Sequence, residues 1–274
     1  MEHTVKAPII IIGIGEIGGV LARGFLRLGH PVYPVVRDSD MNTLAAMIDA
    51  PALVVVAVGE AELQTVLANL PTPWRLRVAL LQNELLPGDW QIHLTNPSVI
   101  SLWFEKKRGQ DVKVLLPSPA YGPRAGLLRD ALAALGIPVR LLNSQTDLLF
   151  ELVAKNLYIL TTNIAGLEVG GDVSALQTQH EALMLAVADD VLTLQQSLTG
   201  QSLDRERLIS ALRQAIEADP EHRCMGRSAP ARLSRALHLA HRAGLQVPTL
   251  QGIADTHLPK EALKIPGWTY SELP

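Results

Sequence analysis

Short apolar runs alternate with helical segments through the first half of the chain. Residues 9–12 form a wholly apolar, β-branched run, as expected for a central parallel strand that is covered on both faces. Further strands are predicted at residues 32–36, 53–58, 78–81 and 139–142, and helices at residues 20–28, 61–70 and 127–135. This alternation predicts an α/β domain built on a parallel sheet.

A proline-punctuated stretch interrupts that alternation. Prolines stand at positions 97, 117, 119 and 123, and two short apolar segments lie at residues 99–104 and 112–116. We interpret these segments as additional strands or loops that close the first domain.

The pattern becomes purely helical after residue 147. Helical periodicity runs through residues 148–167, 174–198, 204–218 and 229–243, and a short helix is expected after Pro248. The segment NSQTD, at 143–147, supplies helix-capping residues. We therefore expect two domains, residues 1–144 and residues 145–274, the second of them all-helical and involved in substrate binding or dimerisation. A cleft is expected between the sheet's carboxyl edge and the helical domain.

A glycine-rich motif follows the first predicted strand. In GIGEIG, Gly13, Gly15 and Gly18 are separated by Ile14 and by the pair Glu16 and Ile17. Glycine triplets also make ordinary turns, but between a strand and a helix this spacing is typical of a Rossmann-type dinucleotide-binding domain. The first glycine permits a tight turn, the second lets backbone approach a pyrophosphate, and the third lets the helix pack close to the strand. We predict that the whole segment binds a dinucleotide, whose phosphates lie at the helix N-terminus.

The residues after the second strand bear on which dinucleotide is bound. A carboxylate there would hold the ribose hydroxyls of NAD, whereas an arginine would accept the additional phosphate of NADP. The sequence has Arg37 followed by Asp38. We predict NADP(H), although Arg37 as a solvated loop charge and a decisive role for Asp38 both remain open.

One lysine interrupts an apolar helix at the start of the second domain. Between Glu151 and Glu168 the only charged residue is Lys155. Desolvating an ammonium is costly unless something pairs with it. Lys155 either pairs with Glu151 one turn earlier on a wet edge or has a functional role.

The composition excludes several classes of protein. The 274 residues are 48% hydrophobic and 19% charged with a net charge of −3, which predicts a folded chain and argues against nucleic acid as the main partner. The single cysteine, Cys224, excludes an internal disulfide and fits a reducing cytosol. No signal peptide or membrane span is apparent, so we expect a cytoplasmic protein. The histidines are scattered, and His238 with His241 lacks nearby carboxylates, so no metal site is expected.

Five segments together resemble the ketopantoate reductases, within the larger group of 6-phosphogluconate dehydrogenase-like proteins. The order and spacing of these short segments carry the resemblance, which covers nearly the whole chain. They are GIGEIG at 13–18, GHPVYPVVR at 29–37, LLQNE at 80–84, ELVAKNLYILTTN at 151–163 and GLQVPTL at 244–250.

The resemblance implies a reaction and a set of site residues. The family reduces a 2-oxo acid with NADPH, and Lys155 occupies the position of its catalytic lysine, which implies that its ammonium donates a proton or a strong hydrogen bond to the carbonyl oxygen. Asn163 matches a substrate-binding asparagine, and helical geometry places it about 80° around the axis from Lys155. Asn83 matches an asparagine near the nicotinamide and the substrate. Its alternative role is to cap a helix that starts at Glu84.

Four positions depart from the family pattern. Glu84 and Gly59 replace a glycine and a lysine that are frequent in the family, and Ile159 replaces an asparagine. Most seriously, Ser228 stands where the family has a substrate-binding glutamate, and no Asp or Glu occurs from position 222 to position 254. That stretch instead contains five arginines, of which Arg227 is the expected anion-binding residue.

These observations leave three functional hypotheses. The first is an NADPH-dependent reductase of a small 2-oxo acid, either ketopantoate or, given the lost glutamate, a more anionic acid. The second is a catalytically weak NADP(H)-binding protein with a sensing or regulatory role. The third is another enzyme of the wider group, such as a 3-hydroxyacid dehydrogenase, which the second-half motifs fit less well. The substrate, the direction of flux and the oligomeric state, with a homodimer as one option, are left open by the sequence.

Overall fold

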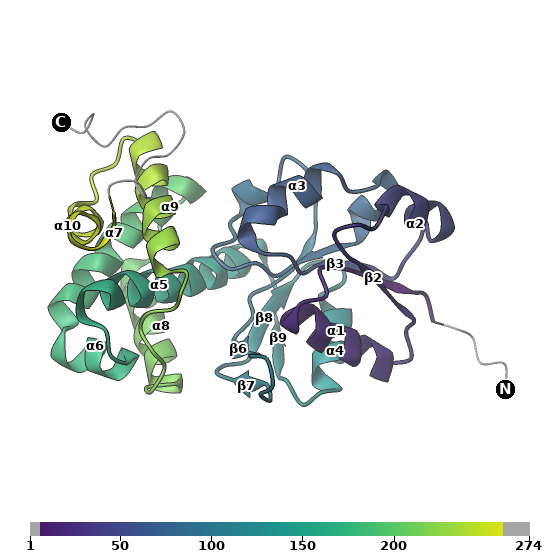
Figure 1. The fold of residues 1–274 in the computed structure, drawn as a ribbon, viewed down its shortest axis with the longest axis horizontal. Coiled ribbons are helices and arrows are strands. Elements are labelled where there is room, and N and C mark those ends of the chain that lie inside the picture. The colour runs from purple at the N-terminus through teal and green to yellow at the C-terminus, as the bar shows by residue number, and fades with distance from the viewer. Residues whose placement is uncertain (1–5, 260–274) are drawn as a thin grey trace. The chain divides into compact units, whose positions relative to one another are not determined.

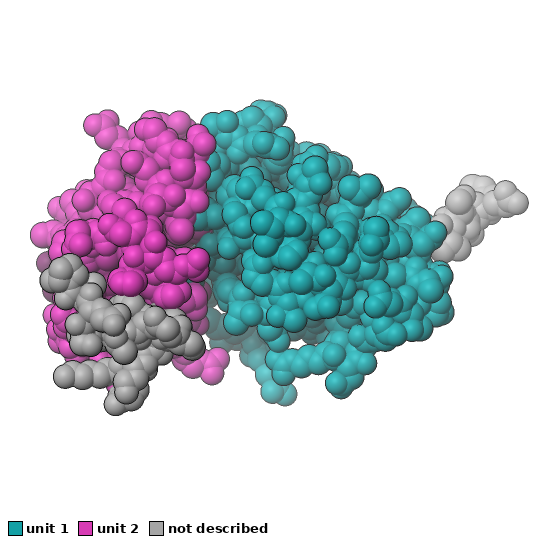
Figure 2. Space-filling view, turned by 90° about the horizontal axis from the view of Figure 1, so that it is seen from above, with its two compact units in different colours: residues 1–152 teal, residues 153–274 magenta. Residues whose placement is uncertain are grey.

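The structure is a computed structural model that describes residues 6–259. The chain forms two compact units, Met1–Leu152 and Val153–Pro274 (Figure 2). The division falls within one continuous helix, α5 (Gln145–Val169), whose first residue follows directly on the boundary expected at residue 144.

The first unit is built on a seven-stranded sheet of order β2-β1-β3-β4-β5-β8-β9 (Figure 1). All its pairings are parallel except the antiparallel pair β5–β8, so the sheet is mostly, and not wholly, parallel. The strands are β1 (Ile9–Ile12), β2 (Val32–Val35), β3 (Leu53–Val56), β4 (Val78–Leu80), β5 (Ser98–Ile100), β8 (Ser118–Tyr121) and β9 (Val139–Leu141). Pro34 is compatible with β2 because this strand is at the edge of the sheet.

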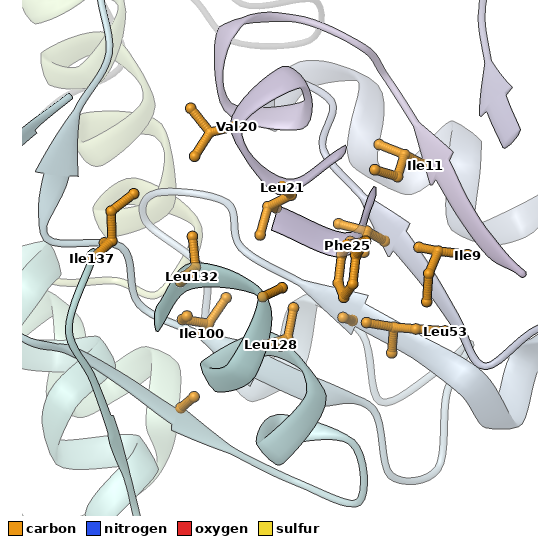
Figure 3. Close-up of a cluster of buried hydrophobic side chains, with 14 of the residues drawn as sticks. Ile9, Ile11, Val20, Leu21, Phe25, Leu53, Ile100, Leu128, Leu132 and Ile137 are labelled. Carbon is orange, nitrogen blue, oxygen red and sulfur yellow. The ribbon is translucent and has the colours of Figure 1, made fainter. Parts of the chain in front are cut away.

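Helices cover both faces of this sheet. Figure 1 shows α1 and α4 on one face and α2 and α3 on the other. The face beneath α1 and α4 is the main core, where Phe25 and Leu128 pack with Ile9 and Leu53 (Figure 3). The bounds are α1 (Glu16–Arg27), α2 (Met41–Met47), α3 (Leu63–Ala68) and α4 (Ala125–Ala133), with the 3-10 helices η1 (Glu60–Glu62), η2 (Thr72–Arg77) and η3 (Pro87–Asp89).

Several predicted elements of the first unit differ in detail. The apolar segment 99–104 is divided between β5 and a separate hairpin, β6 (Phe104–Glu105) with β7 (Lys113–Val114). The sequence analysis missed β8, which contains Pro119, and the short helix α2, which the side chain of Asp40 caps by accepting a hydrogen bond from Asn42 N–H. No helix starts at Glu84, so a capping role for Asn83 at that position is wrong.

The second unit is helical, as predicted. In α5 the residues from Leu152 to Gly166 are buried on all sides, with Lys155 only half-buried among them. The helix predicted at 174–198 is two helices separated at His180. The remaining bounds are α6 (Val173–Gln179), α7 (Glu181–Thr199), α8 (Arg205–Ala218), α9 (Ala229–Arg242) and α10 (Pro248–His257). Among residues 6–259, no helix combines the length and the apolar character that a membrane crossing requires.

Candidate cofactor-binding and substrate-binding residues

The turn after β1 can be made only by glycine. Gly13 has φ +90°, a conformation that L side chains rarely adopt. A Cβ atom there would lie 2.7 Å from the carbonyl oxygen of Ala57, which directly follows β3. Since β2 and β3 lie on opposite sides of β1, this turn is at the point of the sheet where dinucleotides bind in doubly wound folds.

The other two glycines shape the start of α1. A Cβ atom on Gly18 would lie 2.1 Å from the carbonyl oxygen of Gly13, so the helix approaches the turn as closely as a glycine allows. At Gly15, the N-cap, a Cβ atom would meet nothing within 4 Å. The open space above Gly15, next to the free N–H groups of a 12-residue helix, fits a dinucleotide pyrophosphate.

The residues between these glycines have separate roles. Ile17 packs against the core, whereas Ile14 is 43% exposed beside the turn. Glu16 is in the first turn of α1, where its carboxylate lies 3.2 Å from Nζ of Lys106. Lys106, which the sequence analysis did not single out, thus places a cation near the expected phosphate position.

Arg37 lies two residues beyond β2 and forms an ion pair with a residue that follows β3. Its Nη2 donates a hydrogen bond of 3.1 Å to Oε1 of Glu62, which ends η1 after β3. The neighbouring Asp38 is exposed, and Asp40 is used as the α2 cap. Hydrogen bonds from Thr43 and then from Asn42 lower the pKa of Asp40 below its usual value.

Asn83 lies in an unusual turn after β4. The next residue, Glu84, has φ +58°. Among residues 6–259 it is the only residue other than glycine with a positive φ. An ordinary side chain costs about 1–2 kcal/mol in this conformation. Glycine is frequent at this position in the family that the motifs resemble, and the backbone here has a glycine-type turn although Glu84 is not glycine. Such strain is concentrated at functional sites, which supports a binding role for Asn83.

Gln82 holds that turn against the neighbouring strand. Its Nε2 donates to the carbonyl oxygens of Val56 at 2.7 Å and Val58 at 3.3 Å, and its Oε1 accepts from Leu81 N–H at 3.1 Å. The buried amide thus joins the carboxyl ends of β3 and β4. Gln82 was within a quoted motif but was not identified as a positioning residue, because its partners are distant in sequence.

In the second unit, Lys155 is next to an aromatic ring. Its Nζ lies 5.9 Å from the ring centroid of Tyr158, within the range of a cation–π contact. The alternative partner, Glu151, accepts a 2.7 Å hydrogen bond from Arg140 on β9. Because Lys155 is only half-buried and lies over an aromatic ring, its ammonium can remain charged while its stem packs along the apolar helix.

Asn163 is buried and fully oriented by hydrogen bonds. Its Nδ2 donates to the carbonyl oxygen of Ile159 at 2.9 Å. Its Oδ1 accepts from Arg232 Nη1 at 3.1 Å and from Gly226 N–H at 3.4 Å. Arg232 is on α9, and the sequence analysis named Arg227 instead.

Ser228 and Arg227 lie just before α9. Both are exposed, and Ser228 is the N-cap residue of α9 without a side-chain capping hydrogen bond. Their neighbour Cys224 is fully buried, and burial, followed by the charge of Asp172, raises the pKa of its thiol to about 11.

Gly166 allows the loop that contains Gly226 to approach α5. A Cβ atom on Gly166 would lie 2.8 Å from Cβ of Cys224 and 3.1 Å from Cβ of Met225. Close packing at Gly166 therefore positions the backbone N–H that binds Asn163.

Within the described part of the chain, no group of three or more His, Cys, Asp or Glu residues is placed to hold a metal ion.

Solved structures provide the comparison with known proteins, whereas no protein-family model and no curated protein matches the sequence. A probable 2-dehydropantoate 2-reductase from Bacillus subtilis is 18% identical, with a TM-score of 0.67 over 94% of this chain and 100% of that chain. A PanE/ApbA family ketopantoate reductase from Ralstonia eutropha is 16% identical, with a TM-score of 0.63 over 91% and 96%. A glycerol-3-phosphate dehydrogenase from Coxiella burnetii is 14% identical, with a TM-score of 0.53 over 94% and 98%.

At these identities the likeness establishes the fold. The chain has the ketopantoate reductase fold, in which a Rossmann domain precedes a helical domain, and the resemblance expected from its motifs is confirmed at that level.

Proposed function

We propose that the protein reduces a small 2-oxo acid to the corresponding 2-hydroxy acid with NADPH. The observation that carries the proposal is Lys155, a half-buried ammonium on a helix that is otherwise buried along its middle turns. The glycine turn of the first unit supports the cofactor part, since its open space and helix N-terminus suit a pyrophosphate.

Each residue has a defined task in this proposal. NADPH, when bound, supplies the hydride that adds to carbon 2 of the oxo acid. Lys155 donates a proton, or a strong hydrogen bond, to the carbonyl oxygen and so stabilises the negative charge that develops there. Asn83 contacts the nicotinamide end of the cofactor or the substrate, and Ser228 contributes a hydroxyl to the substrate. Asn163 contributes by ordering Arg232 as well as by its own amide.

The substrate class follows from the charge beside Asn163. The guanidinium of Arg232 donates to Asn163, and Ser228, four residues before Arg232, occupies the position of the family glutamate that binds the substrate. A positive group favours an additional anionic group and disfavours a simple hydroxyl. We therefore propose a 2-oxo acid with a second anionic group, in preference to ketopantoate.

A second candidate function is a catalytically weak NADP(H)-binding protein that reports the state of the cofactor to a partner. The loss of the family glutamate at Ser228 favours it, because that loss weakens substrate binding without affecting the glycine turn. We propose a cytoplasmic homodimer for either function. A ketopantoate reductase from Staphylococcus aureus that shares the fold is described as dimeric.

The decisive experiment measures NADPH oxidation by its absorbance against a panel of 2-oxo acids. The panel contains ketopantoate, other 2-oxo monocarboxylates and 2-oxo dicarboxylates. Turnover of at least one acid, highest among the dicarboxylates, is expected. Tight NADPH binding without turnover of any acid would favour the sensing role, and absence of both would refute the reductase proposal.

A further inference from the structure

We infer that Glu62 is a specificity-determining residue of the cofactor site, and that it reduces the preference for NADPH over NADH. This inference rests on the proposed function, since it concerns the same dinucleotide. Its basis is the hydrogen bond of 3.1 Å between Glu62 Oε1 and Arg37 Nη2, the group that would receive the 2′-phosphate.

The two residues are brought together by the order of the strands. Arg37 follows β2 and Glu62 follows β3, and these strands flank β1 with its glycine turn. All three strands run parallel, so their carboxyl ends meet at one edge of the sheet. The ion pair therefore lies at the edge where the adenosine half of a dinucleotide binds.

The pair is open to solvent and can be broken. The Arg37 side chain is 90% exposed and that of Glu62 is 46% exposed. Ion pairs of this kind contribute about 0–1 kcal/mol. A phosphate group, with a charge of about −1.5 to −2 at neutral pH, binds a guanidinium more strongly than a carboxylate does. NADPH can thus displace Glu62, but the displaced carboxylate remains close to the phosphate and repels it.

The segment from β2 to α3, which contains both residues, has no second Lys or Arg to offset that repulsion. Between residues 32 and 68, Arg37 is the only Lys or Arg in the sequence. The same segment contains the carboxylates of Asp38, Asp40, Asp49, Glu60 and Glu62. The family lysine that would follow β3 is replaced by Gly59. A carboxylate also accepts a hydrogen bond from the 2′-hydroxyl of NADH, so Glu62 disfavours NADPH and tolerates NADH.

The test compares dissociation constants for NADPH and NADH, measured by titration calorimetry on the full-length protein. Glu62→Gln keeps the size and the hydrogen-bonding capacity of the side chain but removes its charge. It is expected to tighten NADPH binding about 3- to 10-fold and to change NADH binding by less than about twofold. Glu60→Gln, on the same 3-10 helix, is the matched control and should have the smaller effect.

Arg37→Ala identifies the partner through which Glu62 acts. Arg37→Ala alone should weaken NADPH and leave NADH nearly unchanged. In the Arg37→Ala background, Glu62→Gln should keep the part of its benefit that comes from removing repulsion of the 2′-phosphate. It should lose the part that comes from ending the competition for Arg37.

Two results would overturn the inference. Unchanged or weaker NADPH binding by Glu62→Gln would mean that Glu62 is neutral or that it helps to position Arg37. An equal gain from Glu60→Gln would assign the effect to the general negative field. In both cases the dinucleotide site itself stands. If the parent protein binds neither cofactor, the proposed function fails, and this inference fails with it.

Discussion

Arg232 on α9 donates a hydrogen bond to the amide oxygen of Asn163 on α5, at 3.1 Å. The two residues are 69 positions apart in the sequence. Asn163 is only 9% exposed, so the contact fixes both its amide orientation and one edge of the guanidinium. A basic group is thereby ordered within the second unit, four residues after Ser228, the position at which the family resemblance implies a glutamate.

The first prediction concerns this arginine. Arg232→Ala should raise the KM for a 2-oxo dicarboxylate by about tenfold or more, because a charge-assisted hydrogen bond is lost. The KM for a 2-oxo monocarboxylate should change much less. Steady-state kinetics on both acids provide the measurement, and Arg235→Ala, an exposed arginine of the same helix, is the control.

An equal loss on both acids would indicate that Arg232 only supports Asn163. Arg227→Ala tests the arginine that the sequence analysis expected to bind the anion. If Arg227 is the anion-binding residue, the selective rise in KM for the dicarboxylate appears in Arg227→Ala and not in Arg232→Ala.

The second prediction tests Lys155. Lys155→Ala should lower kcat by about a hundredfold or more, because the developing charge on the carbonyl oxygen loses its stabilising donor. The dissociation constant for NADPH should be unchanged, since the substitution does not affect the glycine turn. Lys107→Ala removes a lysine paired with Glu105 and serves as the control. Parental turnover in Lys155→Ala would remove Lys155 from the catalytic residues.

The third prediction compares two helical glycines. Gly166→Ala should destabilise the protein by about 1–3 kcal/mol, because the new Cβ would lie 2.8 Å from Cβ of Cys224 and overpack the core. At Gly252 on α10 a new Cβ would meet nothing within 4 Å. Gly252→Ala should therefore stabilise by about 0.4–1 kcal/mol. Urea denaturation of the three proteins measures both differences, and a destabilisation shared equally by both variants would contradict this account.

The fourth prediction concerns pH and the buried Asp190. Its Oδ2 accepts hydrogen bonds from Thr249 N–H at 2.7 Å and Leu250 N–H at 3.0 Å, at the start of α10. Burial raises the pKa of this carboxyl, although the hydrogen bonds from Leu250 and Thr249 oppose the shift. Because the folded-state pKa is above the unfolded value, the contribution of Asp190 to stability is present at low pH and is lost as pH rises through the folded pKa.

Asp190→Asn removes this titration and keeps an acceptor oxygen for α10. The free energy of unfolding of the parent, relative to Asp190→Asn, should fall as the pH is raised from about 4, the unfolded pKa of Asp, and then level off. Asp190→Ala should cost about 1–2 kcal/mol through the lost cap. A parent-minus-variant difference that rises with pH would show that the hydrogen bonds outweigh burial.

The sequence alone determined the features that depend on neighbouring residues. The wholly apolar run at 9–12 next to Gly13, Gly15 and Gly18 was sufficient to predict the strand, the tight turn and the helix. The change from alternating elements to continuous helical periodicity after residue 147 predicted the two-part architecture. Strand and helix periods are local properties of the chain, so both can be read without knowing what packs against what.

Tertiary structure decided which side chains meet. Glu62 contacts Arg37, Gln82 joins the ends of β3 and β4, and Arg232, not Arg227, binds Asn163. Each of these contacts joins residues separated by 25 positions or more, and no local pattern distinguishes one arginine or glutamate from another. Partners of this kind depend on the order of strands in the sheet and on which residue of α9 comes within reach of Asn163 on α5, which only the folded chain brings about.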